Sequence, residues 1–68
     1  MKKYKLKSND LVINNAEVVR NETTNEIEYI DWSSTLGVDI EDGVEFSEDE
    51  KDFMITHYCP YWEVIEVE

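Results

Sequence analysis

The chain has 68 residues, of which 17 are Asp or Glu and six are Lys or Arg, so its formal net charge is -11. A chain of this length forms one domain at most, and its core is thin because folding buries only about 60% of its surface. So thin a core leaves little room for the pocket, reactive group and supporting shell of an enzyme. Its charge repels nucleic acid and anionic membranes. We therefore expect a single acidic domain, residues 1–68, that is not an enzyme.

The apolar content indicates that the chain folds. Hydrophobic residues make up 41% of the sequence and eight residues are aromatic, whereas disordered acidic segments contain few aromatic and β-branched residues. The sequence has no apolar run of the length that spans a bilayer, so we expect no membrane partner. Cys59 is the only cysteine. This excludes an intramolecular disulfide and predicts a reducing, cytoplasmic location.

The first half of the chain has the patterns of three strands. Residues 3–7 alternate lysine with apolar groups, which is the period of a half-buried strand. Residues 11–19 are rich in Val and Ile and predict a second strand, bent at 14–15. A polar turn, 20–25, joins it to a third strand, 26–32, in a hairpin. The alternation of the third strand is imperfect, so either a bulge switches its faces or both faces are partly covered.

A second hairpin is predicted at residues 38–46, after a connection at 33–37. Its three-residue loop, 41–43, places all the apolar side chains on one face, with Gly43 in the left-handed position that ends such loops. The expected apolar pairs are Ile40 with Val44 and Val38 with Phe46. The register also places Asp39 opposite Glu45. Directly opposed carboxylates destabilise a hairpin, so a sequence that keeps them could have a use for them.

A helix is predicted from about Ser47 to Tyr58. Ser47 and Glu50 match the capping box, a hydroxyl followed three residues later by Glu. The acids of the first turn favour the positive end of the helix dipole. Pro60 ends the helix, and residues 61–67 predict a final strand. The fold class is α+β: a small, mostly antiparallel β-sheet with one short helix (about 47–58) and a C-terminal strand.

Eight acids and one lysine fall between residues 39 and 52, and we call these acids the acidic stretch. They are Asp39, Glu41, Asp42, Glu45, Glu48, Asp49, Glu50 and Asp52. They could stand in for phosphates, because carboxylates at i and i+2 of a strand lie about 6.6 Å apart on one face. They could equally form a solvated face that keeps a small protein in solution. Trp62 is the leading candidate for an aromatic anchor beside them, since Trp and Tyr dominate interface energetics.

Metal sites and nucleophilic catalysis have weaker support. With Gly43 at position 6 of a calcium loop, Val38 and Ile40 would occupy ligand positions, so the EF-hand pattern fails. A weak cation site outside that pattern stays open. His57 and Cys59 are too few for a zinc site and lack an evident orienting group for a nucleophile. We therefore predict no catalytic residue, no metal ligand and no cofactor.

In its size, acidity and lack of catalytic motifs, the whole chain resembles phage-encoded DNA-mimic proteins. That group includes inhibitors of uracil-DNA glycosylase, anti-restriction and anti-CRISPR proteins, and a phage inhibitor of the nucleoid protein HU. The resemblance implies an inhibitor that occupies the basic DNA-binding surface of a host protein in the host cytoplasm and displaces DNA, without binding nucleic acid itself. HU and a DNA-processing or CRISPR nuclease are the credible targets. The chain departs from the most acidic mimics in its lysine-rich start, which we expect outside the mimicking face.

Two other functions remain as alternatives. One is a small structural or assembly-partner domain that adds an edge strand to another protein, with the charge serving solubility. The other is a weak cation-binding domain. The sequence leaves the target and the oligomeric state open, with a homodimer among the options.

Overall fold

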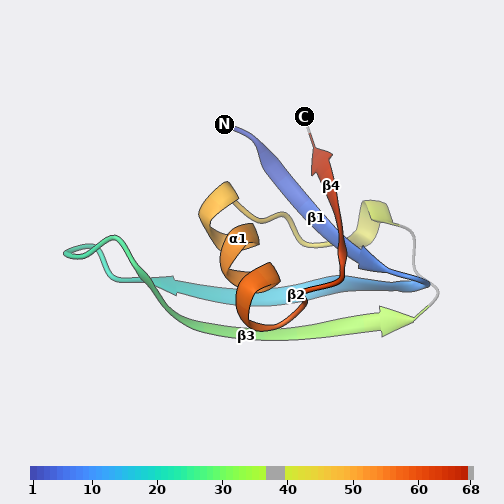
Figure 1. Ribbon diagram of the computed structural model, residues 1–68, viewed down its shortest axis with the longest axis horizontal. Helices are drawn as coiled ribbons and strands as arrows, with labels where there is room; N and C mark the ends of the chain where they lie inside the picture. The colour runs from blue at the N-terminus through green and yellow to red at the C-terminus, as the bar shows by residue number, and fades with distance from the viewer. Residues whose placement is uncertain (37–39, 68) are drawn as a thin grey trace.

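The computed structural model describes residues 1–36 and 40–67. Its elements are β1 (Lys3–Ser8), β2 (Leu11–Arg20), β3 (Ile27–Leu36), the 3-10 helix η1 (Ile40–Asp42), α1 (Glu48–His57) and β4 (Glu63–Val67). The four strands form an antiparallel sheet in the order β3-β2-β1-β4, with α1 beside β2 and β3 (Figure 1). The α+β class predicted above is confirmed. No helix in these described ranges is long and apolar enough to cross a membrane.

β2 and β3 form a long hairpin, as predicted. Its turn is closed by Asn21, whose N–H donates to the Glu26 carbonyl at 2.8 Å. The side-chain oxygen of Asn21 accepts from the N–H groups of Thr23 and Thr24. Asn25 has a left-handed backbone, with φ of 60°, which Asn adopts more readily than most residues. The asparagines of this turn therefore supply both its hydrogen bonds and its reversal.

β3 is longer than predicted, because it continues to Leu36. The connection expected at 33–37 is therefore wrong through Leu36. Asn14, the extra residue of a bulge in β2, stabilises this extension: its side chain donates to Thr35 Oγ1 and accepts from Ser33 Oγ. The predicted bend in β2 is thus confirmed, and the polar residues that suggested a connection are ladder residues bound to that bulge.

A second bulge explains the imperfect alternation of β3. Arg20 pairs with Ile27 while Val19 pairs with Tyr29, so Glu28 is an extra residue between two pairs. Val19 and Arg20 are neighbours in β2 and therefore point to opposite faces of the hairpin. Their partners, Tyr29 and Ile27, lie on opposite faces for the same reason. Of the two explanations considered, the bulge is confirmed. Ile27 packs against the core, whereas Tyr29 is exposed.

β1 and β2 pair only near the turn that joins them and then diverge, and we call the gap between them the fork. β1 pairs with β4 along most of its length but with β2 at only two positions. Residues 44–46 fill the fork: Val44 N–H donates to the Ile13 carbonyl at 2.9 Å, and Phe46 exchanges hydrogen bonds of 2.7 and 2.8 Å with Tyr4. Phe46 is 1% exposed, so this insertion also delivers the largest fully buried side chain of the core.

The hairpin predicted after β3 is wrong. Ile40 does not pair with Val44; its carbonyl instead accepts from Gly43 N–H at 2.9 Å at the end of η1. Val38 and Asp39 lie outside the described residues, as do the pairs expected of them. The physical reason is the fork, because β1 and β2 offer the segment backbone partners that a local hairpin would have to supply itself.

Gly43 is needed for close approach and not for a left-handed turn, since its φ lies outside the left-handed region. A Cβ there would lie 2.9 Å from Val12 Cγ2 and 3.0 Å from the Ile40 carbonyl oxygen. Such distances are below ordinary van der Waals contact, so any other residue would push η1 away from β2. Gly43 therefore sets how tightly η1 covers Val12, which is fully buried.

α1 has the predicted start and stop. Ser47 is the N-cap: its Oγ accepts from Glu50 N–H at 3.3 Å, and the Glu50 carboxylate accepts from Ser47 N–H at 2.7 Å. Tyr58 is the C-cap, two residues before Pro60. The helix contributes Met54 to a core of Leu6, Val12, Ile13, Ile30, Phe46, Met54 and Cys59. This core holds α1 on one face of the sheet.

Candidate partner-binding surface

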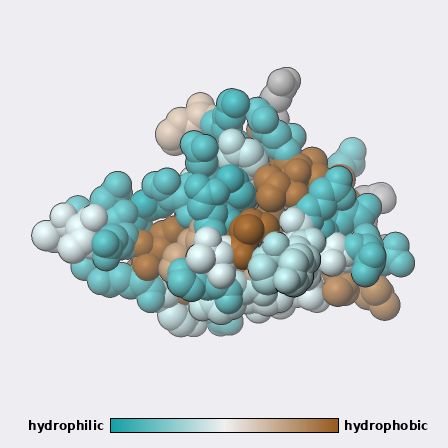
Figure 2. Space-filling view, viewed as in Figure 1, coloured by the Kyte–Doolittle hydropathy of each residue, from teal (hydrophilic) through white to brown (hydrophobic). Residues whose placement is uncertain are grey.

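The carboxylates of the described residues lie mostly on the surface, and most form no ion pair with another described residue. Fifteen of the 17 belong to the described residues; all are exposed except Glu50, which is half-buried. Three of the fifteen form ion pairs, Glu66 with Lys2, Asp49 with Arg20 and Asp52 with Lys51. The other twelve have no ion pair with a described residue. Figure 2 shows one face of the molecule, on which hydrophilic residues surround small, separate hydrophobic patches.

The structure divides the acidic stretch into two groups. Glu41 and Asp42 are exposed on η1, and Glu48, Asp49 and Asp52 are exposed on α1. In the view of Figure 1, η1 and α1 lie on either side of β1 and β4. The exposed Glu45 lies in the segment that connects them, and Asp39 is outside the described residues. The acids are thus close in sequence but follow a path across the molecule.

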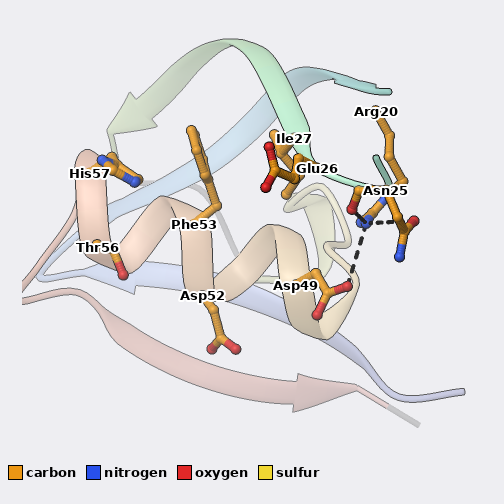
Figure 3. Close-up of a pocket in the computed structure, with 9 residues that line it drawn as sticks. All are labelled: Arg20, Asn25, Glu26, Ile27, Asp49, Asp52, Phe53, Thr56 and His57. Atoms are coloured by element: carbon orange, nitrogen blue, oxygen red, sulfur yellow. Dashed lines mark hydrogen bonds and ion pairs between the residues drawn. The ribbon is translucent and has the colours of Figure 1, made fainter. Parts of the chain in front are cut away.

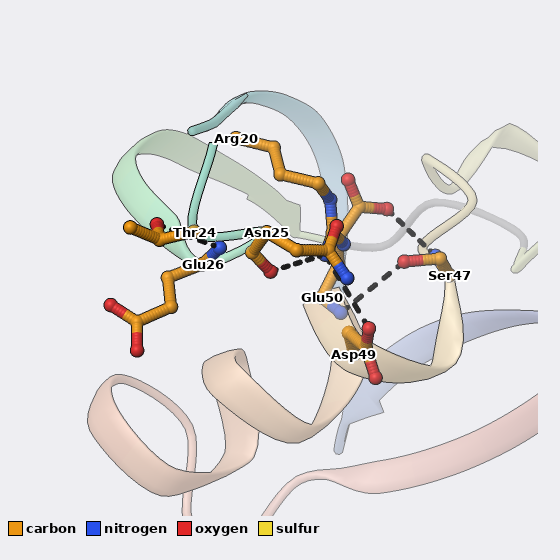
Figure 4. Close-up of polar contacts among 7 residues, drawn as sticks. All are labelled: Arg20, Thr24, Asn25, Glu26, Ser47, Asp49 and Glu50. Carbon is orange, nitrogen blue, oxygen red and sulfur yellow. Dashed lines mark hydrogen bonds and ion pairs between the residues drawn. The ribbon is translucent and has the colours of Figure 1, made fainter. Parts of the chain in front are cut away.

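The acids of α1 differ in how they are held. Glu50 is fixed by the cap with Ser47, and Asp49 lies 3.4 Å from Arg20 (Figure 4). Asp52 accepts a hydrogen bond from Lys51, and this bond raises the pKa of Lys51. Glu48 has no ion pair with a described residue. The helix therefore presents one unpaired carboxylate beside two whose charge is partly offset.

The lysines of the first strand are close to the acidic stretch. Lys5 Nζ donates to the backbone carbonyl of Glu41 at 3.0 Å, and Lys2 lies 3.6 Å from Glu66 of β4. Lys51 of α1 lies 4.8 Å from the centre of the Tyr4 ring in β1, within the range of a cation–π contact. The lysine strand therefore borders the acidic surface.

Trp62 is half-buried and lies edge-to-face with Trp32, with ring centres 6.0 Å apart. It packs against the core. Its neighbour Tyr61 is 96% exposed, and Tyr29 and Tyr58 are about half exposed. The role of Trp62 as a partner anchor stays a prediction, and the more accessible aromatic rings are those of tyrosines.

The register of the hairpin reveals an acidic pair that the sequence patterns missed. Glu17 of β2 lies directly opposite Asp31 of β3, on the face away from Ile30 and the helix. Val19 and Tyr29 form the next outward-facing pair and are both exposed. Partial burial, followed by the charges of Asp31 and Glu17, raises the pKa of Tyr29. A bulge predicted at Glu28 would have given this register and, with it, the pairing of Glu17 with Asp31.

Two grooves adjoin α1 and share Arg20, Asn25 and Asp49 in their walls. One, about 430 Å³, lies between the helix and the turn end of the hairpin (Figure 3). The other, about 620 Å³, lies between residues 1–3 and the start of the helix. The first groove has three acids and one arginine in its lining, whereas the second has three acids and three Lys or Arg. The first is therefore the more acidic of the two.

His57 and Cys59, the other residues considered for chemistry, lie in different surroundings. The His57 ring packs on Phe53, with ring centres 4.4 Å apart. Cys59 is fully buried, and its burial raises the pKa of its thiol. Within residues 1–36 and 40–67, no three His, Cys, Asp or Glu side chains are grouped so that they could hold a metal ion.

The chain was compared with family models, curated proteins and solved structures, and none of them matches it.

Proposed function

We propose that the protein is a non-enzymatic inhibitor that presents a DNA-like negative surface to a basic DNA-binding protein and displaces DNA from it. The observation that carries the proposal is the state of the carboxylates. Twelve of the fifteen in the described residues have no ion pair there, and fourteen are exposed. Exposed charges that are not neutralised internally are available to a partner.

The dimensions of the molecule support this function. Its principal extents are 38 × 23 × 18 Å, and the longest is close to one helical turn of B-DNA, about 34–36 Å. A duplex as long as the protein, 38 Å, carries roughly 22 phosphate charges at one per ~1.7 Å. The whole chain carries a net charge of -11, about half as many on a body of similar length. Such a field attracts a strongly basic surface and speeds the encounter at low salt.

HU and a DNA-processing or CRISPR nuclease are the proposed classes of target, in the cytoplasm of the host. The test is competition. A labelled DNA duplex bound to a purified HU protein, or to a CRISPR nuclease, is titrated with this protein, and anisotropy reports the released duplex. We expect displacement that weakens steeply as salt rises, as DNA binding itself does. No displacement at low salt from any basic DNA-binding protein tested would contradict the proposal.

Charge reversal locates the surface. Glu45 and Glu48 are exposed acids without an ion pair in the described structure, as are Asp10 and Glu22 elsewhere on the surface. The double variant Glu45→Lys with Glu48→Lys should weaken displacement far more than the control Asp10→Lys with Glu22→Lys. The two variants have the same net charge, so equal losses would place the binding surface outside the acidic stretch.

A strand-addition domain is the second candidate, and the edge position of β4 favours it. β4 is the last strand in the order β3-β2-β1-β4, and Val64 on it is 41% exposed. An accessible edge can pair with a strand of another chain. Such a partner would be held by backbone hydrogen bonds, so its affinity should change little with salt, in contrast to that of a phosphate mimic.

A further inference from the structure

The groove between α1 and the turn end of the hairpin has an apolar floor. Phe53 of the helix and Ile27 of β3 face each other across it (Figure 3). Both side chains are half-buried and pack against the hydrophobic core. The groove holds about 430 Å³, at the small end of ligand pockets, which span about 300–1,000 Å³. It is large enough for one long side chain of a partner.

The rim of this groove is acidic. Glu26, Asp49 and Asp52 line it, and Arg20 is the one Lys or Arg among its lining residues. Asp49 and Asp52 each have an ion pair, whereas Glu26 has none with a described residue. In Figure 3 the Glu26 carboxylate lies on the hairpin side of the groove, next to Ile27, and the Phe53 ring lies on the helix side. The groove therefore has an available carboxylate above an aromatic floor.

Arg20 shows that this end of the groove accommodates a guanidinium group. Its Nη1 donates to the Asn25 carbonyl at 3.1 Å and lies 3.4 Å from both Asn25 Oδ1 and Asp49 Oδ2. The chain also makes a cation–π contact elsewhere, between Lys51 and Tyr4. The groove offers a guanidinium group both kinds of partner, the Glu26 carboxylate and the Phe53 ring.

We propose that the groove receives an arginine side chain of the basic partner protein. The aliphatic part of the arginine lies along Ile27 and Phe53, and its guanidinium group binds the Glu26 carboxylate over the Phe53 ring. His57 packs on Phe53 from the same helix at 4.4 Å and supports the ring. Arginine fits better than lysine because its planar group stacks on aromatic rings and can bind a carboxylate through two hydrogen bonds. This inference rests on the proposed function and names the side chain that the acidic surface selects.

The test titrates the folded 68-residue protein, observed by its amide NMR resonances, with a nine-residue arginine peptide and a matched lysine peptide. The arginine peptide should shift the resonances of Glu26, Ile27, Phe53 and His57 most. It should bind about 3-fold or more tighter than the lysine peptide. Shifts centred on the outer pair Glu17 and Asp31, or equal affinity of the two peptides, would overturn the proposal.

Three variants separate the groove from general charge. Glu26→Gln should weaken binding of the arginine peptide about 5-fold, while Glu22→Gln, which removes an equal charge in the same turn, should change it less than about 2-fold. Phe53→Leu should weaken it about 3-fold. Glu26 is exposed, so its variant keeps the test valid if Phe53→Leu does not fold. Equal effects of Glu26→Gln and Glu22→Gln would refute a specific groove.

The titration is independent of DNA competition, so the two proposals can fail separately. Displacement of DNA that is unaffected by Glu26→Gln would refute the groove and leave the proposed function standing. Binding of the arginine peptide in the groove without displacement of DNA from any target would refute the proposed function and leave the groove standing. Groove resonances that shift with protein concentration alone would mean that a second copy occupies the groove, which would overturn the assignment to a partner.

Discussion

Arg20 Nη1 lies 3.4 Å from Asp49 Oδ2, and this ion pair connects the turn end of the β2–β3 hairpin to the first turn of α1. The only other cation beyond residue 7, Lys51, is bound to Asp52. Both cations therefore neutralise an acid of α1: Arg20 pairs with Asp49 from the hairpin, and Lys51 pairs with Asp52 within the helix. Of the other thirteen acids in the described residues, Glu66 alone has an ion pair there, with Lys2, and the remaining twelve are in the state that the proposed function needs.

The Arg20–Asp49 pair should contribute modestly to stability. Asp49→Asn should lower the free energy of unfolding by about 0.2–1 kcal/mol beyond its control, since the pair is partly exposed. The control is Glu48→Gln, which removes a charge from the same helix turn without removing an ion pair. Arg20→Met should cost about 1–2 kcal/mol, because the Asn25 acceptors also lose their charged donor. Urea unfolding measures all three, and equal values for Asp49→Asn and Glu48→Gln would show that the pair has no stabilising role.

Removing one charge from the outer face of the hairpin should stabilise the fold. Glu17 and Asp31 are direct cross-strand partners, and like charges in that position destabilise a sheet. Glu17→Gln should therefore raise the free energy of unfolding by about 0.2–1 kcal/mol at low salt, and the gain should shrink as salt screens the pair. Glu22→Gln in the exposed turn should have little effect. A Glu17→Gln variant no more stable than Glu22→Gln would show that the two carboxylates do not repel each other measurably.

Local hydrogen-bond patterns were predictable from the sequence, and long-range pairings were not. The capping box of Ser47 and Glu50 and the stop before Pro60 depend on residues a few positions apart, so the sequence alone predicts them. Residues 44–46 instead pair with Ile13 and Tyr4, more than 30 positions away. The fork that receives them exists only once β1, β2 and β4 have assembled. A local hairpin was therefore the simplest interpretation, and it was wrong.

The candidate surface was predictable to the same extent. The exposed acids of α1 follow from the helix and its cap. The pairing of Glu17 with Asp31 depends on the position of the Glu28 bulge, which changes the register by one residue. The contact between Arg20 and Asp49 joins residues 29 positions apart. The groove that this contact borders could not be found before the hairpin and helix were placed together.

Gly43→Ala should destabilise the protein despite the smaller conformational entropy that alanine gives the unfolded chain. The new Cβ would lie 2.9 Å from Val12 Cγ2, and Val12 is fixed in a strand with a restricted rotamer. The overpacking should cost about 1–3 kcal/mol, against a gain of about 0.4–1 kcal/mol from the unfolded state. With Val12→Ala the clash loses its partner, so the double variant should lose less than the sum of the singles. A Gly43→Ala variant as stable as the parent would show that η1 can move without cost.

Cys59 should report the opening of the core. The thiol is fully buried, so a thiol reagent should label it slowly in the native protein and at the rate of an exposed thiol in urea. Burial raises the pKa of Cys59 above its unfolded value, so the thiol stays protonated longer in the folded state. Its contribution to stability is therefore complete below the unfolded pKa of about 8.5 and is lost as the pH rises beyond it.

The Cys59→Ala variant isolates this contribution from those of the other titrating groups. Urea unfolding of both proteins between about pH 7.5 and pH 10 should show that the parent loses more stability with rising pH than the variant does. Tyr29, whose pKa is also raised, is present in both proteins and cancels in the difference. Fast labelling of the native thiol, or parallel pH profiles for the parent and the variant, would show that Cys59 is accessible to water and that the core beneath α1 is open on the timescale of the experiment.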